Sequence, residues 1–140
     1  MNIEAFLLCE CATESQGKLN VLGAFAHINA KQMPIVYPAC TIAGRIRFSK
    51  IERGEHEVRV SLIDQDGKEI IPALKGNIPV KVRDDADSSV VNFILHVQRL
   101  KLEKYGDYRV DLAIDGRQEA SLPLYVRKTR EQSRRSDTQS

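Results

Sequence analysis

The sequence predicts an all-β domain, an antiparallel β-sandwich that is immunoglobulin-like or related and has about eight to nine strands. Polar and apolar residues alternate over residues 57–62 and 107–114, so each strand has one buried face and one wet face. Asp66-Gly67 and Asp115-Gly116 follow these runs, and Asp-Gly readily adopts the positive φ angles of a tight hairpin. Short strands separated by regularly spaced turns are typical of a sandwich or barrel.

Residues 3–13 should form a first strand that is apolar on both faces for part of its length. A helix is the alternative, because short apolar runs suit either structure. One face of the strand would carry Ala5, Leu7, Cys9 and Cys11, and the other would carry Phe6 and Leu8. Turn residues at 14–17 then send the chain back into a strand over 19–25, where Gly23 indicates a bulge or a close backbone approach.

The middle of the chain predicts a connection, a strand and a hairpin. Residues 31–38 include two prolines and should connect to the other side of the fold. The next strand should point Ile42, Gly44, Ile46 and Phe48 inward. Strands at 57–62 and 68–71 should flank the turn at 64–67, Pro72 should end the second strand, and residues 76–79 should open another.

The last part of the chain adds three alternating segments, at 91–97, 107–114 and 120–126, after a polar loop at 84–89. Together the two sheets should enclose one apolar core, formed by Leu7, Phe25, Ile46, Val60, Leu62, Phe93, Leu95, Val110, Leu112, Leu122 and Leu124.

The composition fits one domain over residues 1–127, followed by a polar tail. The chain has 140 residues and a formal net charge of only +2, which gives no argument for a nucleic-acid partner. Residues 128–140 contain no aliphatic or aromatic side chain. They cannot bury the apolar surface that would offset the entropy of ordering, so we expect this tail to be disordered.

The cysteine count and the first residues predict a cytoplasmic protein. The chain has 3 cysteines, an odd number, and we expect reduced thiols. Residues 1–4 lack the basic start of a signal peptide. No apolar run approaches the ~18 residues that a membrane-spanning segment needs, so no membrane partner is expected.

Residues 104–110, Lys-Tyr-Gly-Asp-Tyr-Arg-Val, resemble the tyrosine corner of immunoglobulin-like sandwiches. In that motif a glycine two residues before a tyrosine opens a late strand, which here would be Gly106 before Tyr108. The resemblance implies that the phenol donates a hydrogen bond to the backbone a few residues upstream. It concerns the fold and implies no activity.

Three segments, residues 1–9, 17–25 and 113–119, together resemble an uncharacterised family of small bacterial proteins, a domain of unknown function. The resemblance implies a stand-alone, mostly β domain of bacterial origin. No activity is assigned to that family, so the resemblance carries over no catalytic residue.

Cysteines form one candidate metal site, although no cofactor is expected. Cys9 and Cys11 share a strand face, and with Cys40 and a histidine they could bind zinc. Structural zinc ligands usually have two residues between paired cysteines, and here there is one. Small buried thiols in a strand are the favoured interpretation.

Aspartates form a second candidate, for calcium. One turn carries Asp64 and Asp66, and another loop carries Asp84, Asp85 and Asp87. Calcium prefers several hard oxygen ligands at once, so the two loops could bind it if they met at one end of the sandwich. The alternative is ordinary turn chemistry, with the loops apart, because aspartate stabilises turns.

The remaining polar residues suggest no reaction. No nucleophile lies at a motif spacing from His27, His56 or His96, and the chain has no nucleophile elbow, phosphate loop or dinucleotide fingerprint.

Three arginines could form a basic strip for phosphate if their strands are neighbours, namely Arg45, Arg47 and Arg59. A solvated sheet face on which carboxylates such as Glu57 pair with them is the favoured interpretation.

We therefore expect a non-enzymatic interaction module with a protein partner, because an open sandwich offers edge strands and end loops for contact. The alternative is a calcium-dependent binding domain or an enzyme that uses the Asp64/Asp66 and Asp84/Asp85/Asp87 loops.

Overall fold

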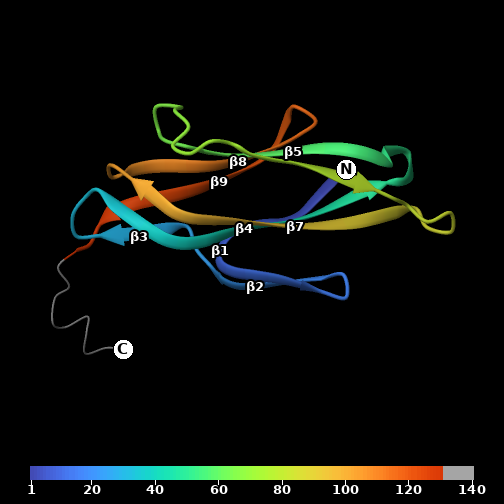
Figure 1. Ribbon diagram of the computed structural model, residues 1–140, viewed down its shortest axis with the longest axis horizontal. Helices are drawn as coiled ribbons and strands as arrows, with labels where there is room; N and C mark the ends of the chain where they lie inside the picture. The colour runs from blue at the N-terminus through green and yellow to red at the C-terminus, as the bar shows by residue number, and fades with distance from the viewer. Residues whose placement is uncertain (131–140) are drawn as a thin grey trace.

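The computed structural model describes residues 1–130 as two packed β-sheets (Figure 1), which confirms the predicted all-β sandwich. No α-helix occurs in these residues, and a single 3₁₀ turn, η1 (Lys50–Glu52), interrupts the strands. The nine strands are β1 (Asn2–Ser15), β2 (Lys18–Ala24), β3 (His27–Ala30), β4 (Ile35–Ser49), β5 (Gly54–Ile63), β6 (Leu74–Val80), β7 (Ser88–Leu102), β8 (Gly106–Ile114) and β9 (Arg117–Lys128).

The four-stranded sheet has the order β2-β1-β4-β7, and the five-stranded sheet has the order β3-β9-β8-β5-β6. All neighbouring strands are antiparallel except β3 and β9, which pair in parallel with His27 opposite Tyr125. This parallel pair departs from the purely antiparallel prediction. After β2 the chain crosses from the four-stranded sheet to the edge of the five-stranded sheet. There β3 lies beside β9 and runs in the same direction as β9.

The core lies between the sheets and follows the predicted alternation. Seven predicted core residues are buried, namely Ile46, Val60, Leu62, Phe93, Val110, Leu112 and Leu124. Phe25, Leu95 and Leu122 are partly buried and pack against them. The prediction was wrong for Leu7, which is only partly buried. Phe6 and Leu8 enter the core instead, and strand alternation then turns Leu7 to the outer face.

Residues 9–24 form a hairpin that folds under the four-stranded sheet, and we call it the β1–β2 arm. The first half of β1 pairs with β4, and from Cys9 onward β1 pairs with β2 (Figure 1). Cys9, Ala12 and Ala43 form a small second core on the outer face of the sheet. Arg45 and Asn92 donate hydrogen bonds to the Gly17 carbonyl at 3.2 and 3.1 Å, which attaches the tip of the arm. The apolar run of β1 predicted burial on both of its faces. One face packs in the core between the sheets, and the other contributes to this small outer core.

Strand β4 begins earlier than predicted, at Ile35, so the expected connection over 31–38 is shorter and Pro38 lies within the strand. Pairing with β1 starts only at Thr41, and residues 35–39 pair with β7 alone. A proline lacks an N–H donor, and it is tolerated where one side of a strand has no neighbour.

The return from the turn at 64–67 is also shorter than predicted. Over residues 68–71 only a single bridge forms, between Ile63 and Glu69, and the strands that pair with β5 are β8 on one side and β6 on the other. Residues 76–79, predicted to open a strand, lie inside β6, which is an edge strand and can therefore accommodate Pro79.

The predicted domain boundary after Arg127 falls one residue before the end of β9. Lys128 pairs with Ala30, and the Thr129 amide donates to the Ala30 carbonyl at 3.0 Å. The rest of the predicted disordered tail, residues 131–140, lies outside the described residues.

Tyr108 ties the start of β8 to the loop before it. Its ring is 4% exposed, and its hydroxyl donates a 2.7 Å hydrogen bond to the Lys104 carbonyl, four residues upstream, which is the geometry of a tyrosine corner. Gly106 has a φ of +154°, and a Cβ there would lie 2.9 Å from Oε1 of Gln65. The same Gln65 oxygen accepts from the Asp107 amide at 3.2 Å, so Gly106 permits this close approach.

Replacing Tyr108 by phenylalanine should cost about 1 kcal/mol of unfolding free energy, because it removes one hydrogen bond and leaves the Lys104 carbonyl with no phenol donor. Denaturant titration of wild type and Tyr108→Phe measures the difference. Tyr37→Phe is the control, since the Tyr37 hydroxyl makes no hydrogen bond within residues 1–130 and its loss should change little. Unchanged stability in Tyr108→Phe would contradict the role of the corner.

Gly44→Ala should destabilise the protein by about 1–3 kcal/mol, because the added methyl group would overpack the core there. Gly44 lies directly opposite Phe93, and a Cβ would come within 2.1 Å of the Phe93 ring. Gly76→Ala is the matched control, since no atom lies within 4 Å of a Cβ on this strand residue. Thermal melts of both variants should show a large loss only for Gly44→Ala, and equal melting temperatures would refute the packing argument.

Candidate binding site at the β3–β9 edge

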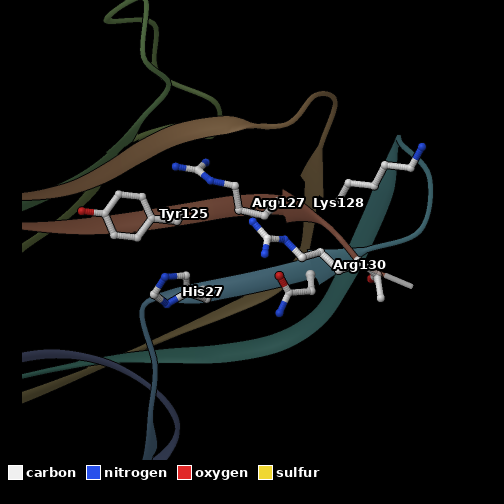
Figure 2. A pocket seen from close by; sticks show the side chains of 7 residues that line it. His27, Tyr125, Arg127, Lys128 and Arg130 are labelled. Carbon is white, nitrogen blue, oxygen red and sulfur yellow. The ribbon is translucent and has the colours of Figure 1, made fainter. Parts of the chain in front are cut away.

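A hollow of 610 Å³ lies on the outer face of the parallel β3–β9 pair (Figure 2). It is larger than the 510 Å³ hollow beside the 64–70 turn. Its lining residues come from both strands and from the two residues after β9, and they are His27, Asn29, Tyr125, Arg127, Lys128, Thr129 and Arg130.

Strand alternation places four of these side chains outward, namely His27, Asn29, Tyr125 and Arg127. Ile28 and Val126 are buried in the core, so the residues on either side of each face away from it. The parallel register then sets His27 beside Tyr125 and Asn29 beside Arg127. The ring centroids of His27 and Tyr125 are 5.1 Å apart, and Figure 2 shows the two rings side by side at one end of the hollow.

The cationic groups occupy the rest of the hollow. The Arg127 guanidinium lies 5.2 Å from the centre of the Tyr125 ring and forms a 2.5 Å ion pair with Asp107. It also donates to the Gly106 carbonyl at 3.1 Å, so its position is fixed. Lys128 and Arg130 have no carboxylate partner within residues 1–130.

Within residues 1–130 the site therefore combines three cations, of which Arg127 is already paired with Asp107, with an aromatic ring, an imidazole and an amide. None of the lining residues in that range is a carboxylate. Such a surface can bind an anionic group through charge and hydrogen bonds. The sequence suggested no reaction for His27 and assigned Lys128 and Arg130 to the polar tail. The basic residues at the end of β9 can be recognised in the sequence. The parallel pairing that brings them beside β3 cannot, because no pattern of neighbouring residues indicates it.

The two aspartate loops lie at opposite ends of the sandwich, so the five carboxylates do not converge. Residues 64–67 follow β5, whereas residues 84–87 follow β6, which is antiparallel to β5 (Figure 1). Asp64 stabilises its own turn by accepting from the amides of Asp66 and Lys68 at 2.9 and 3.0 Å. The Lys68 amide is the main reason that the pKa of Asp64 is lowered. The alternative of calcium or enzyme chemistry on joined loops finds no support in this arrangement.

The three cysteines are also dispersed. All are free thiols: Cys9 lies in the outer cluster, Cys40 lies in the main core, and Cys11 is exposed. Burial raises the pKa of Cys40 to about 11, so its thiol is protonated at neutral pH. No group of three metal-binding side chains assembles anywhere in the described part of the chain.

Each of the other two histidines has a structural partner. His96 Nδ1 is 3.4 Å from the Thr41 hydroxyl. His56 contacts the Glu52 carbonyl through Nε2 and the Asp115 carboxylate through Nδ1, the latter at 2.6 Å. Both partners of His56 are acceptors, so the ring satisfies both contacts when both of its nitrogens carry a proton, as in the imidazolium cation. Such a ring has no free nitrogen with which to act as a general base.

The arginines do not form one strip. Arg45 and Arg47 share Glu4, at 2.9 and 2.6 Å, on the outer face of the four-stranded sheet. Arg59 belongs to the other sheet and pairs with Glu69 at 2.9 Å. This is the carboxylate-paired surface that the sequence favoured, although Glu4 and Glu69 are the partners rather than Glu57.

These features define a small β-sandwich domain with a cationic surface hollow. Residues 4–127 match the model of a family of unknown function, DUF6941, so the chain belongs to that family. This confirms the predicted relation to an uncharacterised, mostly β family. No curated protein matches the chain. Among residues 1–130, no helix has the length and apolar character to span a membrane.

Calcium at millimolar concentration should leave the melting temperature unchanged, because the two aspartate loops are at opposite ends and neither supplies the six or so oxygen ligands that the ion needs. Differential scanning fluorimetry with calcium and with EDTA makes the comparison. A calcium-dependent rise that Asp64→Asn abolishes would contradict this expectation.

The His56 contacts predict that stability falls as the pH rises. The Glu52 carbonyl, and after it Asp115, raise the pKa of His56 above its unfolded value of about 6.5. The stabilisation is therefore complete below about pH 6.5 and is lost as the pH passes the folded-state pKa. Melting temperatures should decline as the pH rises from about 6.5 through the folded-state pKa, and His56→Gln should flatten this decline. His96→Gln is the control, and a wild-type profile in His56→Gln would contradict the assignment.

Proposed function

We propose that this protein is a non-enzymatic, cytoplasmic interaction module that binds an extended acidic segment of a partner protein at the β3–β9 edge. The observation that carries the proposal is the cationic hollow, because Arg127, Lys128 and Arg130 line it and no residue within 1–130 contributes a carboxylate to its lining. A partner with carboxylates at matching spacing would supply the missing negative charge.

The open edge of β3 supports a partner in extended form. β3 is the last strand of its sheet, and its second edge has no backbone hydrogen bond within residues 1–130. An extended segment could add there as a further strand through main-chain hydrogen bonds. Alternate side chains of that segment would then face the same side as His27 and Asn29, toward the cations.

The aromatic residue in the hollow supports a protein rather than a nucleic acid. Tyr125 is already flanked by His27 and Arg127, at 5.1 and 5.2 Å, which leaves no free aromatic face for a row of stacked bases. The whole chain carries a formal charge of only +2, which is small for a nucleic-acid-binding domain.

The cytoplasmic location and the absence of catalysis belong to the same proposal. Three free thiols suit a reducing compartment. Both nitrogens of His56 are occupied, and the other two histidines have no carboxylate within hydrogen-bonding distance among residues 1–130.

A labelled peptide with alternating Glu and Val residues tests the proposed site by fluorescence anisotropy. Wild-type protein should bind it in a salt-dependent manner. The double variant Lys128→Glu/Arg130→Glu should bind at least about tenfold more weakly, because two attractive charges become repulsive.

Lys75→Glu/Arg83→Glu is the matched control, since it changes the net charge equally at exposed residues remote from the hollow. It should bind as wild type does. A peptide with proline at every second position should also bind weakly, because it cannot donate to the β3 edge. Equal losses in both double variants, or tighter binding of a single-stranded oligonucleotide than of the peptide, would refute the proposal.

A further inference from the structure

Strand β7 is a long edge strand without a partner on one side. It spans 15 residues and pairs with β4 from Ser49↔Ser88 to Ile35↔Leu102. It ends the four-stranded sheet, and its second edge has no backbone hydrogen bond within residues 1–130. Its first eleven residues, 88–98, include no Asp, Glu, Lys or Arg, and Arg99 and Lys101 follow them.

Two of the other three terminal strands, β6 and β2, carry features that protect against further pairing. β6 contains Lys75 and Pro79. β2 begins with Lys18 and is bent by Gly23, whose φ is +70°. Charges, prolines, short length and bends are the devices by which proteins block strand addition. Residues 88–98 of β7 have none of these devices, because Arg99, whose φ is +54°, and Lys101 come only after that stretch. A long, uncharged stretch of edge is suited to pairing.

We propose that β7 pairs antiparallel with β7 of a second copy of this chain about a twofold axis at Ile94, which joins two four-stranded sheets into one. This register is self-complementary. On the inner face Phe93 would lie opposite Leu95 of the second copy, and Val91 opposite Val97. On the outer face the two Ile94 side chains would meet, and Asn92 would lie opposite His96 of the second copy.

The charges at the ends of β7 also fit a second copy. Like charges directly opposite each other destabilise a strand pair. In a symmetric pair, a charged residue close to the twofold axis would lie near the same residue of the second copy. The first charge after Gln98 is Arg99, which this register places opposite Ser89. Lys101 would lie opposite Asp87 of the second copy, so these charges attract.

An apolar hollow beside β7 supplies a reason for the pairing. Between the edges of β6 and β7 lies a space of 190 Å³, and its lining includes Val58, Leu74, Ile78, Phe93 and Leu95. Phe93 and Leu95 reach this space from the inner face of β7. The second copy would bring its own Leu95 and Phe93 alongside them, which removes apolar surface from water. The low net charge of +2 opposes association little.

Sedimentation velocity of the full-length protein over a wide concentration range tests the proposal. Wild type should form a dimer, and Ile94→Lys should weaken it at least about tenfold, since two ammonium groups would meet on the axis. Leu22→Lys is the charge control, because it places the same charge on the terminal strand at the other side of the sheet, where Leu22 is 68% exposed. It should remain dimeric. Ile94 also packs against the small outer core, so the cross-linking test described below, which introduces no charge, separates loss of the dimer from damage to the monomer.

A monomeric wild type, or loss of the dimer in Leu22→Lys but not in Ile94→Lys, would overturn the proposal. Circular dichroism verifies that each variant is folded. This surface lies in the four-stranded sheet, so the acidic-peptide experiment on β3 and β9 can fail or succeed independently.

Cysteine cross-linking tests the register without relying on a destabilising charge. In a Cys11→Ser background, which removes the exposed thiol, Ile94→Cys should form an intermolecular disulfide under mild oxidation. Val90→Cys alone should not, because its partner across the axis is Gln98. A mixture of Val90→Cys and Gln98→Cys proteins should cross-link. Cross-linking by Val90→Cys alone, or none by Ile94→Cys, would refute the axis at Ile94.

Discussion

Strand β4 is buried on both faces, and the rest of the molecule is built around that constraint. Its inner side chains, Ile42, Ile46 and Phe48, fill the space between the sheets. Its outer residue Ala43 is fully buried too, under the β1–β2 arm. A strand in a simple two-layer sandwich has one wet face, so β1 must double back to cover the second one. The arm, the small outer core and the shared Glu4 pairs of Arg45 and Arg47 all follow from this arrangement.

The arm also explains the unusual division of β1. The second half of β1 leaves β4 and pairs with β2, which is one end of the four-stranded sheet. β7 pairs with the opposite edge of β4 and is the other end. Asn92 of β7 holds the tip of the arm through Glu14 and the Gly17 carbonyl, at 2.7 and 3.1 Å. The outer face of β7 is thereby half-covered, while its backbone edge stays open. The same strand thus stabilises the monomer through its side chains and offers its main chain for association.

The two proposed contact surfaces depend on different interactions. The β3–β9 hollow depends on charge, and salt would weaken it, because its cations are exposed to solvent. The β7 edge depends on main-chain pairing and apolar contact, which salt affects little. A dimer joined at β7 would carry two copies of the cationic hollow. An elongated acidic partner could then engage both copies, and its affinity would gain from the linkage of two binding events.

The sequence by itself determined the all-β class, most core residues and the tyrosine corner. These depend on local rules: alternation at Val60 and Leu62, positive φ at Asp115-Gly116, and the spacing from Gly106 to Tyr108. Only the tertiary structure decided the inward face of β1, the parallel β3–β9 pair, the separation of the aspartate loops and the open edge of β7. Each of these depends on which strands are neighbours. Strand order arises from long-range packing and chain crossovers, and alternation within one strand carries no record of the strand beside it.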